Sequence, residues 1–311
     1  MKSLKTKRIF QPETDETSKR LVSDFVGNTP FVQLSEKIFA KLESVNPGGS
    51  IKDRPVKWIL DHAEKNKLLK PGDTIIEATS GNTGIALAMI GAERGYKIKI
   101  VMPCDMSDER KILLKMFGAE LIEVDEGDFE QAIHLKDEIA NQKNFFSLNQ
   151  FNNPLNIECH YKTTFKELLN HSLTIGKYIS AFISGTGTGG TMMGVQKGFS
   201  EFDTRVKMVA VEPEESPVMS GGKKGLHGIQ GIGDGSQFLV ELDKIDEIIT
   251  ISTYDAKERC KKLALENGLL VGISAGANIL ASERWVETNN PDGIVFTILC
   301  DRGERYSSML Y

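Results

Sequence analysis

A lysine that follows a glycine-rich turn is the residue of this chain best placed for chemistry. Lys52 stands in residues 46–54, which read NPGGSIKDR, and this pattern predicts a helix that begins near the lysine. The partial positive charge at a helix N-terminus disfavours an ammonium group. A lysine held as a neutral amine can form a Schiff base with a carbonyl compound. Taken alone, the pattern is also typical of a solvated lysine beside a turn.

Three further segments carry groups that suit an anionic ligand. Residues 77–84 (EATSGNTG) follow a predicted strand and place hydroxyls and backbone N–H groups at a helix N-terminus, which suits a carboxylate. Residues 184–191 (SGTGTGGT) can wrap a phosphate, although they lack the Gly-Lys-Ser/Thr ending of a nucleotide P-loop. In residues 272–277 (GISAGA), Ser274 can cap a helix or hydrogen-bond a heterocyclic nitrogen. Each segment alone also fits an ordinary turn.

The elements that must position these segments alternate along the chain. We predict strands at 74–78, 97–102, 120–124, 179–183, 206–211 and 294–299 and helices at 84–93, 107–117, 129–141, 255–266 and 276–287. This alternation is typical of α/β proteins with parallel sheets. Two such stretches predict two three-layer αβα domains with mostly parallel sheets. Ligands of such sheets bind at the carboxyl ends of the strands, so we expect the site in the interdomain cleft.

Composition narrows the class of protein. The 311 residues are 40% hydrophobic and 26% charged, as in an ordinary globular enzyme. A net charge of −5 argues against a general nucleic-acid binder. The four cysteines are scattered without a CxxC pair, which favours reduced thiols in the cytoplasm over disulfides or a metal site. No stretch approaches the ~18 apolar residues of a membrane span, so we expect no membrane partner.

Together the motifs resemble those of fold type II (tryptophan-synthase-β-like) pyridoxal-phosphate enzymes, and among them the cysteine synthase and cystathionine β-synthase family. NPGGSIKDR, EATSGNTGIALA, QFNNP, GTGTGGT, GIQGIG and GISAG occur in the family's order, and the resemblance runs from residues 27–30 to 302–306. It implies pyridoxal 5′-phosphate as cofactor and a homodimer. It also implies a smaller, mobile domain at 40–152 that clamps the substrate. A larger domain, at 1–39 and 153–311, would carry the phosphate cup and the dimer surface.

The resemblance also assigns roles to individual residues. Lys52 matches the lysine that binds the cofactor covalently and moves the Cα proton. The other implied cofactor contacts are Asn82 at the 3′-oxygen, Ser274 at the pyridine nitrogen, and a phosphate cup of Gly187, Thr188, Gly189, Gly190 and Thr191. The implied substrate-binding residues are Thr79, Ser80, Gly81, Thr83, Gln150 and Gly231. A neutral hydroxyl at Ser274 suits β-elimination to an α-aminoacrylate better than transamination.

The implied activity is β-replacement on a small amino acid, with sulfide or water as the second reactant. We expect O-acetylserine sulfhydrylase, which makes L-cysteine from O-acetylserine and sulfide. Asp234 departs from the small apolar residue usual in O-acetylserine-using relatives. An inward carboxylate could activate water and favour a cysteine lyase that releases hydrogen sulfide, whereas an outward one would be a turn residue. A serine dehydratase and a cofactor-binding paralogue without turnover remain as further alternatives.

Overall fold

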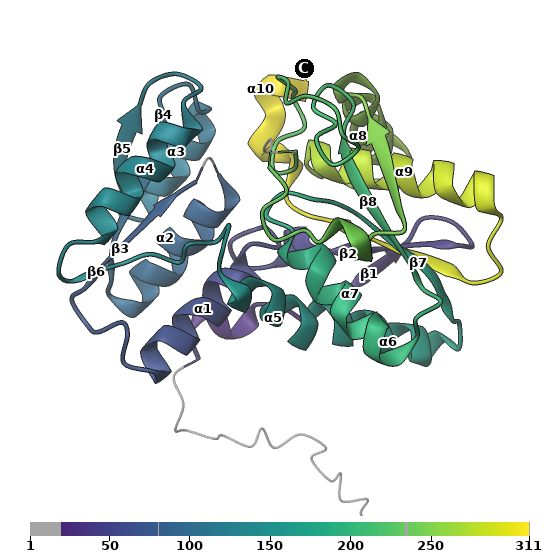
Figure 1. The fold of residues 1–311 in the computed structure, drawn as a ribbon, viewed down its shortest axis with the longest axis horizontal. Helices are drawn as coiled ribbons and strands as arrows, with labels where there is room; N and C mark the ends of the chain where they lie inside the picture. The colour runs from purple at the N-terminus through teal and green to yellow at the C-terminus, as the bar shows by residue number, and fades with distance from the viewer. Residues whose placement is uncertain (1–19, 80, 234–235, 311) are drawn as a thin grey trace, which may run out of the picture.

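The computed structural model describes residues 20–79, 81–233 and 236–310, which contain two largely parallel sheets (Figure 1). The four-stranded sheet has the order β5-β4-β3-β6 and the six-stranded sheet the order β1-β2-β10-β7-β8-β9. The strands are β1 (Phe31–Gln33), β2 (Ile38–Leu42), β3 (Thr74–Ala78), β4 (Lys97–Pro103), β5 (Glu120–Val124), β6 (Phe145–Phe146), β7 (Ile179–Gly185), β8 (Lys207–Pro213), β9 (Glu247–Ile251) and β10 (Ile294–Leu299). Only the β1–β2 pair is antiparallel among the pairings of these strands.

Helices cover both faces of each sheet. The α-helices are α1 (Asp53–Lys65), α2 (Asn82–Arg94), α3 (Asp108–Met116), α4 (Phe129–Ala140), α5 (Pro154–Lys162), α6 (Thr164–Ile175), α7 (Gly190–Phe202), α8 (Thr253–Asn267), α9 (Ile273–Asn289) and α10 (Ser307–Leu310). Short 3₁₀ turns are η1 (Val22–Phe25), η2 (Glu43–Val45), η3 (Leu242–Lys244) and η4 (Gly303–Tyr306). The predicted α/β class with mostly parallel sheets is confirmed.

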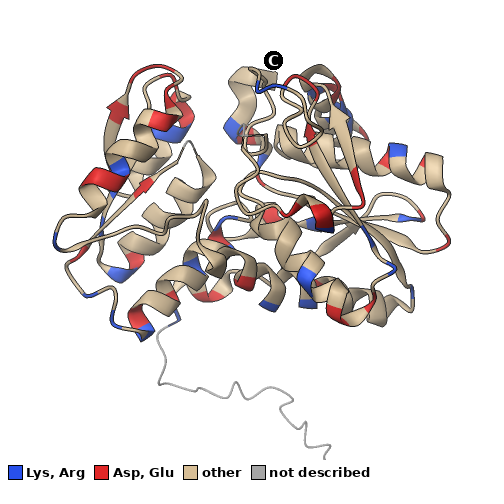
Figure 2. Cartoon of the chain, in the orientation of Figure 1, with Lys and Arg blue, Asp and Glu red and all other residues tan. Residues whose placement is uncertain are grey.

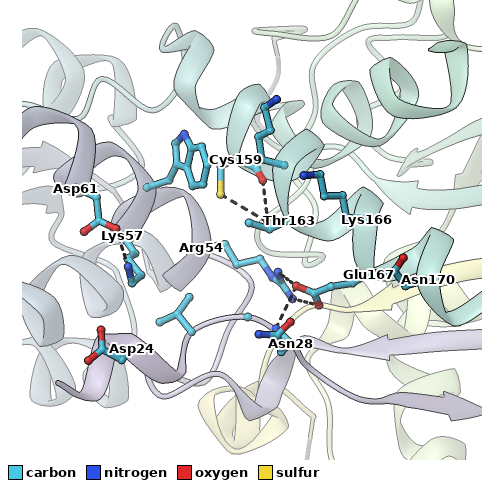
Figure 3. Close-up of a pocket in the computed structure, with 14 residues that line it drawn as sticks. Asp24, Asn28, Arg54, Lys57, Asp61, Cys159, Thr163, Lys166, Glu167 and Asn170 are labelled. Atoms are coloured by element: carbon cyan, nitrogen blue, oxygen red, sulfur yellow. Dashed lines mark hydrogen bonds and ion pairs between the residues drawn. The ribbon is translucent and has the colours of Figure 1, made fainter. Parts of the chain in front are cut away.

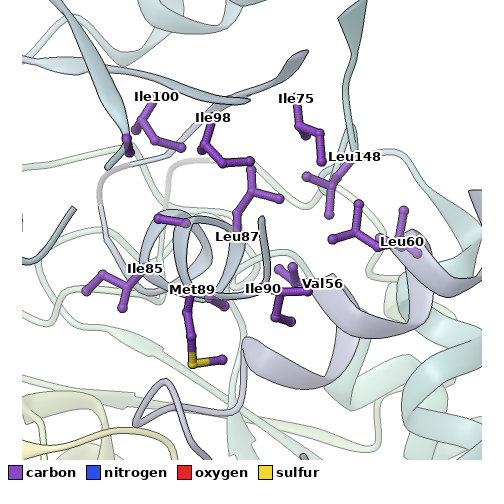
Figure 4. Packing of buried hydrophobic residues seen from close by; sticks show 14 of the residues in the cluster. Val56, Leu60, Ile75, Ile85, Leu87, Met89, Ile90, Ile98, Ile100 and Leu148 are labelled. Carbon is purple, nitrogen blue, oxygen red and sulfur yellow. The ribbon is translucent and has the colours of Figure 1, made fainter. Parts of the chain in front are cut away.

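Successive residues of the strands in the smaller sheet face opposite sides of it, so each side of the sheet is covered by its own set of apolar side chains. Ile75 packs with α1 and α2 on one face, whereas its neighbour Ile76 packs towards α4 on the other. Ile98 and Ile100 of β4 face the same way as Ile75, and Figure 4 shows them gathered around α2. Because this core closes on α2 from both strands, it holds the N-terminus of that helix at the carboxyl end of β3.

The larger sheet is covered by α5, α6 and α7 on one face and by α8 and α9 on the other. Helices α5 and α7 approach closely: a Cβ on Gly190 would lie 2.1 Å from the Asn156 side chain, and one on Gly194 would lie 2.6 Å from His160. Glycine at these two positions lets the helix backbones meet. Strand β2 pairs with β10, so residues 38–42 lie in this sheet.

Several elements carry no clear sequence pattern. Strand β1 has three residues, and β2 contains Lys41, which is fully buried. A buried lysine breaks the apolar run expected of an inner strand. Lys41 is tolerated because its Nζ lies 2.5 Å from Glu167 and 4.0 Å from Glu43. These long-range partners cannot be read from local periodicity.

Lys and Arg positions and Asp and Glu positions are interspersed along the ribbon in both halves of the molecule (Figure 2). Among the helices of residues 20–79, 81–233 and 236–310, none is both long and apolar enough to cross a membrane.

The buried carboxyl group of Glu77 makes the stability of the smaller sheet depend on pH. Burial raises the pKa of Glu77 to about 7, against the opposing effects of Lys136 and the Asn149 N–H. The unfolded carboxyl loses its proton near pH ~4.3, so the folded state binds more protons between about pH 4 and 7. Stability from this group is therefore complete below about pH 4 and is lost as the pH rises through about 7.

We predict that Glu77→Gln, which cannot ionise, gains stability relative to the parent protein between pH 5 and pH 8. Urea unfolding at the two pH values measures the change, and any constant packing effect of the substitution cancels in the difference. A difference in unfolding free energy that stays the same at both pH values would show that Glu77 does not titrate in this range.

Candidate active site

The predicted segments meet at two small adjoining cavities between the sheets, of about 80 and 50 Å³. Both cavities are lined by Lys52, Asn82, Thr188 and Gly231. The first also contacts the predicted substrate-binding residues Thr79, Gly81, Thr83 and Gln150. The second contacts Gly187, Gly189, Thr191 and Ser274. Gly190 lines neither cavity but begins α7, and Ser80 and Asp234 lie outside the described residues.

Lys52 is the N-cap residue of α1, directly before the helix begins. The end of β10 holds the preceding residues: the Ile51 N–H donates to the Cys300 carbonyl over 2.8 Å, and Ser50 forms an antiparallel bridge with Asp301. The turn before Lys52 is closed by the Gly48 N–H, which donates to the Asp53 carboxylate over 2.5 Å. The lysine is therefore placed by a loop that is bonded on both sides.

The predicted phosphate cup precedes α7 and is supported from behind by α5. Gly189 has φ +86°, which favours glycine, and a Cβ there would lie 2.7 Å from Val240. The Thr188 hydroxyl accepts from the Asn156 carboxamide over 3.0 Å. Successive N–H groups at the start of a 13-residue helix suit a phosphate dianion.

His160 lies behind the same cup, one turn after Asn156 on α5. Its Nε2 lies 3.3 Å from the Thr191 hydroxyl and its Nδ1 lies 2.8 Å from the Thr164 hydroxyl. Complete burial, with the nearby charges of Arg54 and Lys52, lowers the pKa of His160 well below its usual value, so the imidazole is neutral. Sequence reasoning missed Asn156 and His160. Their spacing of four residues on one helix is the only local signal.

The predicted substrate loop is joined to Gln150. The Thr83 hydroxyl donates to the Gln150 carboxamide oxygen over 2.7 Å, and the Gly81 N–H lies 3.3 Å from the Thr79 hydroxyl. Thr79, Thr83 and Gln150 are all buried. Hydroxyl and amide donors at the start of α2 form a compact set that can receive a carboxylate.

Ser274 lies in the first turn of α9 and lines the second cavity. The thiol of Cys300 lines the same cavity. Burial raises the pKa of Cys300 to about 12, so the thiol is neutral. Sequence reasoning took the cysteines only as reduced thiols and missed this position.

A larger cavity lies elsewhere, between η1, α1, α5 and α6, and has a volume of about 460 Å³ (Figure 3). Arg54 lines this cavity on its inner side. The guanidinium of Arg54 binds both Glu43 and Glu167 over distances of 2.6–2.8 Å. No residue assigned above to the cofactor or substrate lines this cavity.

This arrangement is that of a pyridoxal-phosphate-dependent enzyme. The chain matches the family model described as "Pyridoxal-phosphate dependent enzyme" over residues 22–301 and belongs to that family, so pyridoxal phosphate is its cofactor. The residues present fit the group: the glycine cup at the start of α7 suits its phosphate, and the Lys52 amine and the Ser274 hydroxyl line the same cavity.

The chain is also similar to individual proteins along almost its whole length. The chain is 42% identical to the cysteine synthase of Staphylococcus aureus (strain N315) over 302 residues, which cover 92% of this chain and 95% of the relative. It resembles the crystal structure of O-ureido-L-serine synthase with a TM-score of 0.88 at 37% identity, covering 94% and 95% of the two chains. It resembles a hydrogen sulfide-producing enzyme of Fusobacterium nucleatum with a TM-score of 0.88 at 39% identity, covering 93% and 90%. An aspartate-to-asparagine variant of that enzyme was solved with an alpha-aminoacrylate intermediate.

We predict that Lys52→Ala abolishes covalent attachment of the cofactor, because it removes the amine that lines both cavities. Borohydride reduction followed by intact-protein mass spectrometry measures the attachment. Turnover should fall by more than ~10²-fold, the typical contribution of a positioned acid–base group. Lys57→Ala, on the same helix but paired with Asp61 over 2.6 Å, is the matched control and should keep both properties. A reduced cofactor adduct that persists in Lys52→Ala would contradict the assignment.

Proposed function

We propose that the protein makes L-cysteine from O-acetylserine and sulfide, by replacing the group on the β-carbon of the amino acid. The observation that carries this proposal is the 42% identity with cysteine synthases over almost the whole chain, together with two adjoining cavities that share Lys52 and are lined by the predicted substrate loop and by the predicted phosphate cup. A cofactor-binding paralogue without turnover would need none of the predicted substrate-binding residues that line the first cavity.

Each group of residues that lines the two cavities has a separate role in the proposed reaction. When bound, pyridoxal phosphate supplies an electron sink that acidifies the Cα proton and lets the β-substituent leave. Lys52 Nζ takes that proton, and residues 187–191 hold the phosphate. Thr79, Thr83 and Gln150 bind the substrate carboxylate and keep water away from the reacting carbons. Ser274 meets the pyridine nitrogen as a neutral partner.

A second candidate function is release of hydrogen sulfide from cysteine, with water as the incoming nucleophile. Cysteine and water then give serine and hydrogen sulfide, so all atoms balance. The similarity to a hydrogen sulfide-producing enzyme favours this candidate. An aspartate variant of that enzyme was captured with an alpha-aminoacrylate intermediate, which suggests that an aspartate acts after the elimination step. We propose that Asp234 activates the water.

Product analysis separates the two candidates. We predict that O-acetylserine plus sulfide gives cysteine faster than cysteine alone gives serine and sulfide, with both measured by amino-acid chromatography and sulfide detection. Thr79→Ala should raise the KM for either amino acid more than the Kd of the cofactor. Failure to form cysteine in the first reaction, with rapid sulfide release in the second, would replace the first candidate by the second.

The role of Asp234 is read from the same reactions. General-base assistance is typically worth ~10²–10⁴-fold, so Asp234→Asn should slow water addition by such a factor. Sulfide is a stronger nucleophile than water and needs less assistance, so its addition should be retained. Equal rates for the variant and the parent protein in both reactions would make Asp234 a turn residue.

We also propose that the protein is a cytoplasmic homodimer. Cys104, Cys159, Cys260 and Cys300 form no disulfide, which suits a compartment that keeps thiols reduced, and the resemblance to dimeric family members supports the assembly. Multi-angle light scattering at micromolar concentration should give twice the chain mass of 34.4 kDa. A single-chain mass under these conditions would rule the dimer out.

A further inference from the structure

The carboxamide of Asn82 is held on two sides by residues that follow β10. Its Nδ2 donates to Asp301 Oδ2 over 2.6 Å, and its Oδ1 accepts from Arg305 Nη1. A guanidinium has donors but no acceptor, so the oxygen of Asn82 must be the atom that faces Arg305. The chemistry of the partners therefore fixes which end of this carboxamide is nitrogen, a choice that heavy-atom positions alone leave ambiguous.

The ligand-facing chemistry of Asn82 follows from this arrangement. Among the described residues, Arg305 takes one lone pair of the Asn82 oxygen and Asp301 takes one N–H, so the second N–H is available to a ligand. Asn82 lines both cavities of the site. An N–H donor there suits an anionic oxygen on the cofactor ring.

The same two residues also join Asn82 to the turn that carries Lys52. Arg305 Nη2 donates to the Gly48 carbonyl, and the Gly48 N–H donates to Asp53. On the other side, the Tyr306 hydroxyl donates to Asp301 Oδ2 over 2.5 Å. Arg305 and Asp301 are both buried. One short segment after β10 thus bonds both Asn82 and the turn that precedes Lys52.

We propose that Asp301 and Arg305 are positioning residues, which turn the carboxamide of Asn82 so that it donates to the ring oxygen of the cofactor and hold it at a fixed place relative to Lys52. The proposal rests on the proposed function only in taking the cofactor to bind in these cavities. It assigns no contact between Asp301 or Arg305 and the cofactor.

The test uses the visible absorption band of the bound cofactor, which responds to hydrogen bonding at the ring oxygen. In the holoenzyme, Asn82→Ala should shift this band and weaken cofactor binding by about tenfold, as for one hydrogen bond to a charged group. Arg305→Met, which removes the donors but keeps the length of the side chain, should shift the band in the same direction. Arg305→Lys, which still donates, should bring the band back towards that of the parent protein.

A double variant separates positioning from general stability. If Arg305 acts through Asn82, Arg305→Met should add no further shift in an Asn82→Ala background. Arg302→Met is the matched control, because Arg302 donates over 2.9 Å to the Ser44 carbonyl and makes no hydrogen bond to Asn82, so it should leave the band in place. Thermal unfolding of each variant without cofactor reports the purely structural cost.

Three results would overturn the proposal. Arg305→Met could leave the band of the bound cofactor unchanged, or it could shift the band equally with and without Asn82. Asn82→Ala could itself leave the band unchanged, which would remove the contact on which the proposal rests. If Arg305→Met does not fold, Asp301→Ala takes its place: the proposal expects this variant to shift the absorption band of the bound cofactor, and an unchanged band would overturn it. Formation of cysteine by the parent protein is measured independently, so the proposed function stands or falls separately.

Discussion

The site depends on the meeting of helix N-termini at one place between the two sheets. Helices α1, α2, α7 and α9 begin at or beside Lys52, Asn82, Gly190 and Ser274, residues that line or adjoin the two cavities. Each N-terminus carries about half a positive charge and several N–H groups without partners in the helix. Such a place attracts anions and disfavours an ammonium. A cofactor phosphate, a substrate carboxylate and a reactive amine therefore fit these two adjoining cavities for one electrostatic reason.

Holding these helix ends in place requires polar contacts inside the protein. Arg54, in the first turn of α1, is bound by Glu43 from η2 and by Glu167 from α6. Removing one partner of such a buried pair typically costs about 3–5 kcal/mol, because the other charge is left without compensation. The network therefore ties the start of α1 to the larger sheet two residues after Lys52. The large cavity in Figure 3 lies against this network rather than over the site.

The sequence predicted the parts of the molecule that local chemistry specifies. Apolar periodicity located β3, β4, β5 and the helices between them, and glycine-rich turns located the helix starts. It did not locate β1, β2, α5 or α6, where buried Lys41 and polar residues such as Asn156 and His160 interrupt the pattern. Each of these residues also has a partner distant in the sequence: Glu167 for Lys41, Thr188 for Asn156 and Thr191 for His160. The pairing of Asn82 with Asp301 and Arg305, over more than two hundred residues, is of the same kind.

The distribution of charge along the cavity bears on which reaction it serves. Thr79, Thr83 and Gln150 line the first cavity, whereas the second is lined by the neutral thiol of Cys300 and the hydroxyl of Ser274 beside residues 187–191. No carboxylate among the described lining residues of that second cavity can hold a proton on a pyridine nitrogen. The cofactor ring is then a modest electron sink, and a reaction is favoured in which a leaving group on the β-carbon carries the electrons away. Replacement and sulfide release both meet this condition, because they share the elimination and differ only in the nucleophile that follows.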